Sequence, residues 1–263
     1  MIRSLHSAAS GMEAQQTQID VIANNLANSN TVGFKKARAE FQDLLYQEVR
    51  AATKSTDASG GAGQPTGIEI GQGTRLVTTQ KMFHAGDLRQ TGNQLDLAIE
   101  GQGFFRIQER DGQFAYTRAG QFKVTAEGQI VSSLGQPLSP PVFLPPDTTR
   151  VTIERDGTIK AHQPEIVEPV EVGRVELSQF VNPAGLKSLG NGLFRPTEGS
   201  GAAVNAVPGD DGLGDIAQGM LEGSNVKVVE EMIDLIAAQR AYEINSRVIQ
   251  AADQMLGEVA QLR

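Results

Sequence analysis

Histidine and cysteine, which commonly bind metals or act as bases and nucleophiles, are sparse in this chain of 263 residues. The histidines His6, His84 and His162 have no partner at metal-ligand spacing, and there is no cysteine to act as a ligand or nucleophile. The triplets GQG and GSG lack the longer patterns that bind dinucleotides or expose a catalytic serine. We therefore predict no catalytic residues, no metal site and no cofactor, and expect that the protein is not an enzyme. An active site assembled from distant residues stays open as an alternative.

A cluster of hydrogen-bonding amides is the most distinctive polar feature, in the stretch ANNLANSNTVGFKK, residues 23–36. Asparagine is a poor helix former, so this run predicts the end of a helix. We expect Asn28 or Asn30 to adopt the left-handed conformation and Gly33 to open the next turn. Asn24 and Asn28 are four residues apart and share one helical face, so they either contact neighbouring subunits or cap their own helix.

The element that positions these amides is a predicted N-terminal helix. Apolar residues before the asparagine run are spaced alternately by three and four, as on a helix face that packs against other helices. The face comprises Ile2, Leu5, Ala9, Met12, Gln16, Ile19, Ala23 and Leu26. We expect its large members, Ile2, Leu5, Met12, Ile19 and Leu26, to lie in a subunit interface.

A second, longer helix is predicted at the other end of the chain, from Val226 to Leu262. This segment contains no proline and one glycine, and its apolar residues cover more than one side, which is typical of a helix buried on several sides. Ser224 or Asn225 is expected to cap it. One stripe is expected to contact other subunits and includes Val229, Ile233, Ile244, Val248, Met255 and Val259.

The middle of the chain predicts β structure. Asp111-Gly112, Glu127-Gly128 and Asp156-Gly157 separate short runs with the composition of strands, and such dipeptides favour hairpin turns. Residues 182–219 are rich in glycine and predict loops with at most short strands. The runs are TRLVTTQ, LDLAIEG, GFFRIQE, QFAYTR, GQFKVTA, GQIVSS, RVTIE, GTIKAH and GRVELSQF.

These elements predict an α+β fold with long terminal helices and a β-rich middle of short antiparallel strands. We expect residues 1–33 and 222–263 to form a coiled-coil-like inner domain, and residues 76–221 to form an outer domain. Residues 34–75 are expected to be a linker or extended region, with a Gly/Ser/Pro-rich core from Thr53 to Gly67.

The composition of the chain argues against two classes of partner, nucleic acids and the interior of a membrane. The net charge of −8 disfavours nucleic acid, which requires a basic face. No stretch is long and apolar enough to cross a bilayer, and the N-terminus lacks the continuous apolar segment of a secretory signal. We expect a protein that is not embedded in a membrane.

Four stretches, in order, resemble the rod and hook proteins of the bacterial flagellum. The first is the asparagine-rich stretch, which resembles the N-terminal signature of these axial proteins. The others are LRQTGNQLDLAIEGQGFFRI (residues 88–107), AYTRAGQFKVTAEGQIVSSLGQPL (residues 115–138) and the helical stretch from Ser224 to Leu256. The family usually has an acid at Ala119 and an uncharged polar residue at Lys227. The length and the stretch NPAGLKSLGNGLF favour the distal rod branch.

The resemblance implies a structural protein that self-assembles helically into a hollow rod and transmits torque from motor to hook. It implies export through the flagellar type III apparatus without signal cleavage, to a rod that spans the periplasm. Its implied partners are copies of itself, proximal rod proteins, the hook protein and the surrounding P- and L-ring proteins. A proximal rod or hook paralogue, and a secreted coiled-coil adhesin from a different class, are the alternatives.

Overall fold

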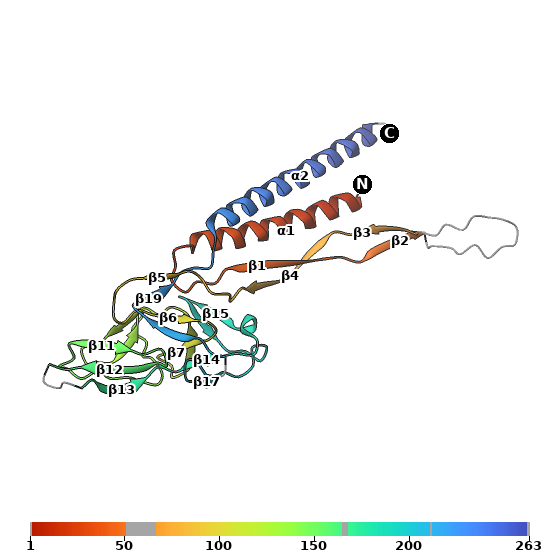
Figure 1. The fold of residues 1–263 in the computed structure, drawn as a ribbon. Helices are drawn as coiled ribbons and strands as arrows, with labels where there is room; N and C mark the ends of the chain where they lie inside the picture. The colour runs from red at the N-terminus through yellow and green to blue at the C-terminus, as the bar shows by residue number, and fades with distance from the viewer. Residues whose placement is uncertain (1, 51–66, 165–167, 211, 262–263) are drawn as a thin grey trace. The chain divides into compact units, whose positions relative to one another are not determined.

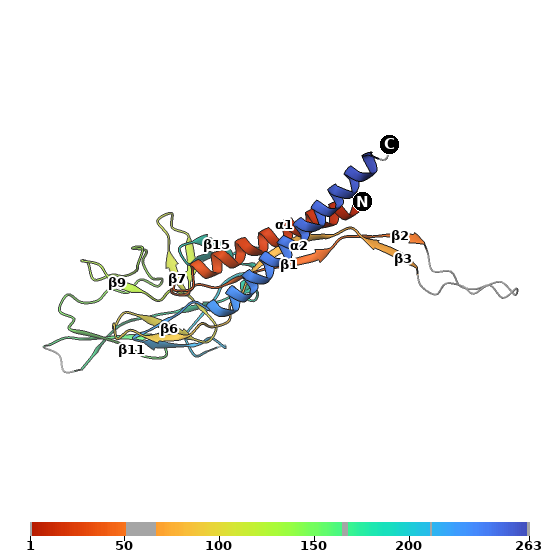
Figure 2. The same ribbon diagram turned by 90° about the horizontal axis from the view of Figure 1, so that it is seen from above.

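A computed structural model describes residues 2–50, 67–164, 168–210 and 212–261 (Figures 1 and 2). The chain forms two compact units. The first contains Met1–Leu26, Ala37–Gln80 and Val228–Arg263, and the second contains Ala27–Lys36 and Lys81–Lys227. The polypeptide therefore passes between the units four times. The predicted linker core, except for Gly67, lies outside the described residues.

Two long helices dominate the first unit, α1 (Ile2–Ala27) and α2 (Val228–Gln261), which confirms both predicted helices. They lie side by side, with the start of α1 and the end of α2 at the same end of the pair (Figure 1). A Cβ atom at Gly11 would be 2.9 Å from Asn245 Nδ2, and Asn25 Nδ2 donates to Glu231 Oε2 at 3.0 Å. The later contact on α1 is the earlier one on α2, so the two helices are antiparallel. The two contacts are separated by the same number of residues on each helix, so one register is kept over about 21 Å, at ~1.5 Å per residue.

An extended β-hairpin also belongs to the first unit. Strand β1 (Ala37–Asp43) pairs with β4 (Thr74–Lys81), and β2 (Tyr46–Arg50) pairs antiparallel with β3 (Ile68–Gly71). Ser10 Oγ on α1 accepts a hydrogen bond from the Thr74 N–H at 3.3 Å, so the hairpin is attached to the helix. The sequence analysis treated residues 34–75 as a linker or extended region, and it did not foresee that their two described ends pair.

The second unit is built from short antiparallel strands, as predicted. Each of the nine predicted runs contains a strand, eight of them in this unit and TRLVTTQ in β4 of the first unit. The three predicted glycine turns connect β7 to β8, β9 to β10 and β11 to β12. The strands are β5 (Leu88–Gln90), β6 (Leu97–Glu100), β7 (Phe104–Gln108), β8 (Phe114–Thr117), β9 (Phe122–Val124), β10 (Ile130–Ser132), β11 (Arg150–Ile153), β12 (Thr158–His162), β13 (Val170–Arg174), β14 (Leu177–Gln179), β15 (Lys187–Gly190), β16 (Leu193–Arg195), β17 (Val204–Ala206), β18 (Asp215–Gln218) and β19 (Met220–Glu222), and a 3-10 turn covers Pro183–Gly185.

A six-stranded sheet with the order β15-β16-β8-β7-β14-β17 forms the largest layer of this unit. Its inner face contributes Phe105, Ile107 and Leu177 to the main hydrophobic core, together with Ile159 of the sheet β11-β12-β13. Half of the six strands, β15, β16 and β17, lie within residues 182–219. Those strands are only three or four residues long, too short to give a periodic signal in the sequence.

Two further strand pairs join the start of this unit to its end. β6 pairs with β18, and β5 pairs with β19, so that Glu222 lies opposite Leu88. This pairing brings the residues that precede α2 beside the residues that follow β4.

The ends of the helices differ from two expectations. After α1 the chain turns at Gly33, where φ is 67°, and neither Asn28 nor Asn30 has the positive φ that we expected. Gly33 is required there because a Cβ atom would lie 2.7 Å from the Ala119 backbone nitrogen. The prediction that Ser224 or Asn225 caps the second helix is also wrong, since α2 begins at Val228.

Candidate functional site

The predicted interface face of α1 is only partly covered by its own chain. Leu5, Met12, Ile19 and Leu26 are half-buried, and the side chain of Ile2 lies outside the described residues. The residues of α1 that are buried belong to another face, with Ala8, Ala14, Ile22 and Asn25. The predicted interface face of α1 therefore does not form the main contact with α2.

The predicted stripe on α2 is exposed. Val229 and Ile233 are 71% and 61% exposed, which is unusual for large apolar side chains. Ile236 adds to this surface although the prediction omitted it. The remaining predicted members, Ile244, Val248 and Met255, are also exposed, and the side chain of Val259 lies outside the described residues.

Small and polar residues make the contact between the helices. Along α2, Glu231, Ala238 and Ala252 are buried, and Asn245 shares their seven-residue spacing and touches Gly11. Small side chains allow the helix axes to come close. A search for apolar heptads misses this face because its members are alanine, glycine and polar residues.

Asn25 has a buried side chain that joins three elements. It is 2% exposed, its Oδ1 accepts from the Ala37 N–H at 2.9 Å, and its Nδ2 donates to the Ala37 carbonyl at 2.9 Å. The same Nδ2 reaches Glu231, so one amide joins α1, β1 and α2. Of the two predicted residues, Asn28 accepts from the Thr31 hydroxyl at 3.1 Å and Asn24 is exposed. Their contact with other subunits stays a prediction.

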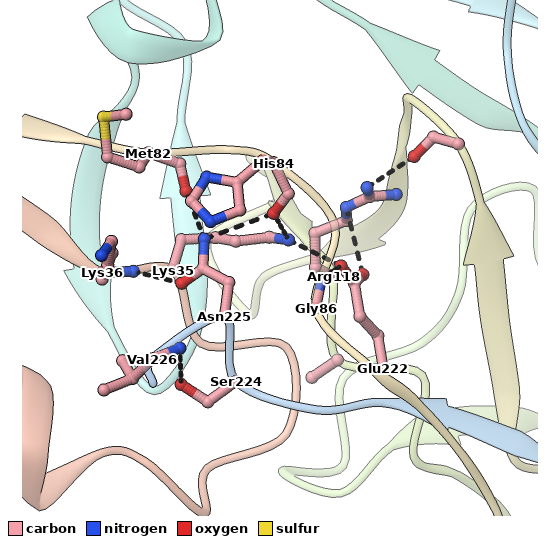
Figure 3. A network of polar contacts seen from close by, with 12 residues as sticks. Lys35, Lys36, Met82, His84, Gly86, Arg118, Glu222, Ser224, Asn225 and Val226 are labelled. Atoms are coloured by element: carbon pink, nitrogen blue, oxygen red, sulfur yellow. Dashed lines mark hydrogen bonds and ion pairs between the residues drawn. The ribbon is translucent and has the colours of Figure 1, made fainter. Parts of the chain in front are cut away.

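A buried polar network lies in the second unit (Figure 3). Glu222, which is 1% exposed, accepts hydrogen bonds at Oε1 from Lys35 Nζ at 2.6 Å and from the Gly86 N–H at 3.0 Å. Its Oε2 is 3.3 Å from Arg118 Nε. The carboxylate of Glu222 therefore contacts two buried cationic side chains and one backbone N–H.

Asn225 extends this network through backbone groups. Its Oδ1 accepts from the Lys36 N–H at 2.7 Å, and its Nδ2 donates to the carbonyls of Met82 at 2.7 Å and His84 at 3.3 Å. Lys35 Nζ also donates to the His84 carbonyl at 2.7 Å. We call the side chains of Lys35, Arg118, Glu222 and Asn225 the junction network.

The junction network joins three segments that enter or leave the second unit. These are residues 33–36 before β1, residues 82–86 after β4 and residues 222–226 before α2. Sequence analysis missed this network, because a lysine, a glutamate and an asparagine in polar loops are usually solvated.

Burial controls the ionisation of the network. It lowers the pKa of Lys35 below that of an exposed lysine, and the nearby Glu222 carboxylate opposes this shift. Burial also lowers the pKa of Arg118. The pKa of His84 is lowered by burial and by the positive charges of Lys35 and Lys36, so this ring is neutral at neutral pH.

Within residues 2–50, 67–164, 168–210 and 212–261, no three His, Cys, Asp or Glu side chains meet in a group that could hold a metal. In those same ranges neither helix has the length and apolarity needed to cross a bilayer. The described residues present exposed apolar helix surface on α2 and a buried polar network in the second unit, and exposed apolar surface of this kind is suited to association with other chains.

Comparison with known proteins supports this interpretation. Three family descriptions match in chain order: "Flagella basal body rod protein" at residues 5–35, "Flagellar hook protein FlgE/F/G D1 domain" at residues 98–161, and "Flagellar basal body rod FlgEFG protein C-terminal" at residues 217–262. The chain is 46% identical to the flagellar basal-body rod protein FlgG of Borreliella burgdorferi over 98% of this chain and 97% of that one. It is 44% identical to FlgG of Caulobacter vibrioides and 43% identical to FlgG of Buchnera aphidicola (subsp. Schizaphis graminum), both over the full length of both chains.

The chain belongs to the FlgG family of flagellar basal-body rod proteins. The expected resemblance is thus confirmed, and the FlgG assignment is supported over the paralogue and adhesin alternatives. The protein is a structural component of the bacterial flagellar basal body. Its relatives are structural rod proteins, and assembly with other flagellar components follows from family membership.

Proposed function

We propose that this FlgG-family chain stacks helically with copies of itself into the hollow distal rod, which transmits torque from the motor to the hook. The single observation that supports this most directly is the exposed apolar side of α2. One side of that helix packs on α1 through small residues, while Val229, Ile233 and Ile244 remain 61–71% exposed. A contiguous apolar surface of this kind marks a binding site in a soluble protein.

The energetic gain from covering this surface is large enough to drive assembly. Each large aliphatic side chain that becomes fully buried contributes about 1.5–3 kcal/mol, and the predicted interface on α1 and α2 contains several. Contacts that do not close on themselves build a helical filament. Two terminal helices with partly uncovered faces are suited to the inner wall of such a filament.

The proposed partners follow from a place in the middle of the flagellar axis. They are proximal rod proteins on one side, the hook protein on the other, and the P- and L-ring proteins around the rod. The chain would leave the cytoplasm through the type III export apparatus without signal cleavage, and the rod that it forms would span the periplasm. In this role it binds no nucleic acid and catalyses no reaction.

Electron microscopy of the concentrated protein tests the proposal. The wild-type chain is expected to form hollow helical polymers. Ile233→Asp is expected to abolish them, because the interface would bury an unpaired carboxylate. Gln239→Asp, at an exposed polar position of the same helix, is the matched control and should polymerise. Discrete closed oligomers of the wild-type chain, or normal polymers of Ile233→Asp, would contradict the proposal.

A further inference from the structure

A hollow of about 590 Å³ in the second unit has an aromatic floor. The ring centroids of Phe83 and Phe104 are 5.4 Å apart, and those of Phe104 and Phe180 are 5.7 Å apart, both in edge-to-face contact. Val181 and Pro183 line the hollow beside these rings. This volume and this largely apolar lining are typical of sites that bind small molecules. A floor of phenylalanine rings favours an aromatic group in the ligand.

Arg118 lines the same hollow and has an incomplete set of partners. Its side chain is 3% exposed, its Nη2 donates to the Gly101 carbonyl at 2.6 Å, and its Nε is 3.3 Å from Glu222 Oε2. Its Nη1 is buried and has no hydrogen-bond partner among the described residues. An arginine stays protonated at neutral pH, and a buried N–H without an acceptor is costly. The guanidinium therefore favours an anionic acceptor, and a carboxylate is the group that it binds most strongly.

The other polar side chains around the hollow do not oppose an anion. No Asp or Glu is among the described residues that line it. The amides of Gln102 and Gln179 are bonded to each other, with Gln179 Nε2 donating to Gln102 Oε1 at 3.3 Å. The His84 ring is neutral at neutral pH, as described above. A negatively charged ligand would thus meet one cation and no fixed negative charge in the lining.

The guanidinium lies directly beside the aromatic floor. Arg118 Cζ is 5.8 Å from the centroid of the Phe104 ring. An aromatic ring in contact with Phe104 would have its centroid about 4.5–7 Å from that of Phe104. A carboxylate that is joined to such a ring by one or two methylene groups can therefore reach Arg118 while the ring stays on the floor.

We propose that this hollow is a binding site for a small aromatic carboxylate. The ring of the ligand packs against Phe104 and Phe180, and its carboxylate accepts hydrogen bonds from the Arg118 guanidinium. The site belongs to the second unit and uses no residue of the exposed apolar side of α2, so it does not depend on the proposed assembly.

Fluorine NMR of the full-length chain, kept dilute, tests the ligand class. The probe is 3-(4-fluorophenyl)propionate, and its primary amide is the matched probe without a charge. A ligand of this size is expected to bind in the millimolar range. The acid should bind about tenfold more tightly than the amide, because a hydrogen bond to a charged group is lost in the amide. Equal dissociation constants for the two probes, or no saturable binding of the acid at millimolar concentrations, would overturn the inference.

Charge variants on the rim test the location of the site. Val181 lines the hollow and is 91% exposed, so its substitution should leave the fold intact. Val181→Asp is expected to weaken binding of the acid about two- to fivefold and Val181→Lys to strengthen it by a similar factor, because the new charge lies beside the carboxylate. Leu134→Asp and Leu134→Lys, at an exposed position of the same unit that does not line the hollow, are the controls and should leave the dissociation constant unchanged. An acid that binds equally to both Val181 variants occupies another site, and this result would also overturn the inference.

Discussion

Glu222 is the only carboxylate of the junction network, among the residues that define it. Its carboxylate is buried between Lys35 and Arg118, and it also accepts from the Gly86 N–H. A buried ion pair is not by itself a source of stability, because removing charges from water is costly. Losing one member of such a group is strongly destabilising, because the remaining charges stay buried without compensation.

We expect Glu222→Gln to lower the free energy of unfolding by about 3–5 kcal/mol, because it leaves Lys35 and Arg118 buried without a counter-charge. Urea unfolding followed by far-ultraviolet circular dichroism measures the change. Glu243→Gln is the control, since it removes only an exposed pair with Arg240, worth about 0–1 kcal/mol. Similar small changes in both variants would show that the junction network does not depend on the charge of Glu222.

At the scale of elements, the antiparallel helix pair depends on close approach rather than on its apolar heptad. Gly11 lies against Asn245, and Asn25 lies against Glu231 at the same register. The larger apolar side chains of both helices are left on other faces. This division allows α1 and α2 to pair within one chain and still offer apolar surface to other chains.

The size of residue 11 is therefore predicted to control the helix pair. Gly11→Leu should separate the helices and lower the thermal midpoint, because even a Cβ atom would lie 2.9 Å from Asn245 Nδ2. Gly11→Ala should have little effect, because the asparagine side chain can move and alanine is favoured over glycine in a helix by about 1 kcal/mol. Circular dichroism during heating measures both variants.

Gly257 on α2 provides the matched control for this prediction. A Cβ atom there would have no described neighbour within 4 Å, so Gly257→Leu should be neutral or stabilising. If Gly11→Leu also leaves the thermal midpoint unchanged, the contact between Gly11 and Asn245 does not determine the spacing of the helices.

At the scale of the whole molecule, the two units differ in how much of their apolar surface they bury. The second unit has a continuous core that includes Phe105, Ile107, Ile159 and Leu177. The first unit buries mainly alanines between its helices and leaves large side chains such as Ile233 exposed. Long helices without a large buried face are only marginally stable in water.

Amide hydrogen exchange is expected to show this difference. In the dilute monomer, amides of α1 and α2 should exchange faster than those of β7 and β8, and assembly into polymers should slow exchange in both helices. Mass spectrometry of peptides from the two states provides the measurement, with the β7–β8 peptides as an internal control. Strong protection of both helices in the dilute monomer would contradict this expectation.

Local patterns in the sequence were sufficient for several features. Three-and-four spacing predicted the first helix, and a long segment without proline and with apolar residues on more than one side predicted the second. Asp-Gly and Glu-Gly pairs predicted three hairpins, and the four family-like stretches predicted the flagellar axial family. These signals are readable because each depends on residues that are near one another in the chain.

The tertiary structure decided which polar residues matter. Asn25, rather than Asn24 or Asn28, is buried against α2, although it contacts Glu231 from 206 positions away in the chain. Lys35 and Glu222 meet across 187 positions, and β2 pairs with β3 around a stretch that composition marked only as a linker. Periodicity describes the face on which a residue lies, but a contact between distant segments depends on how the chain folds back. The amides that end the first helix were therefore visible in the sequence, whereas the residue among them that joins three elements was determined only by packing.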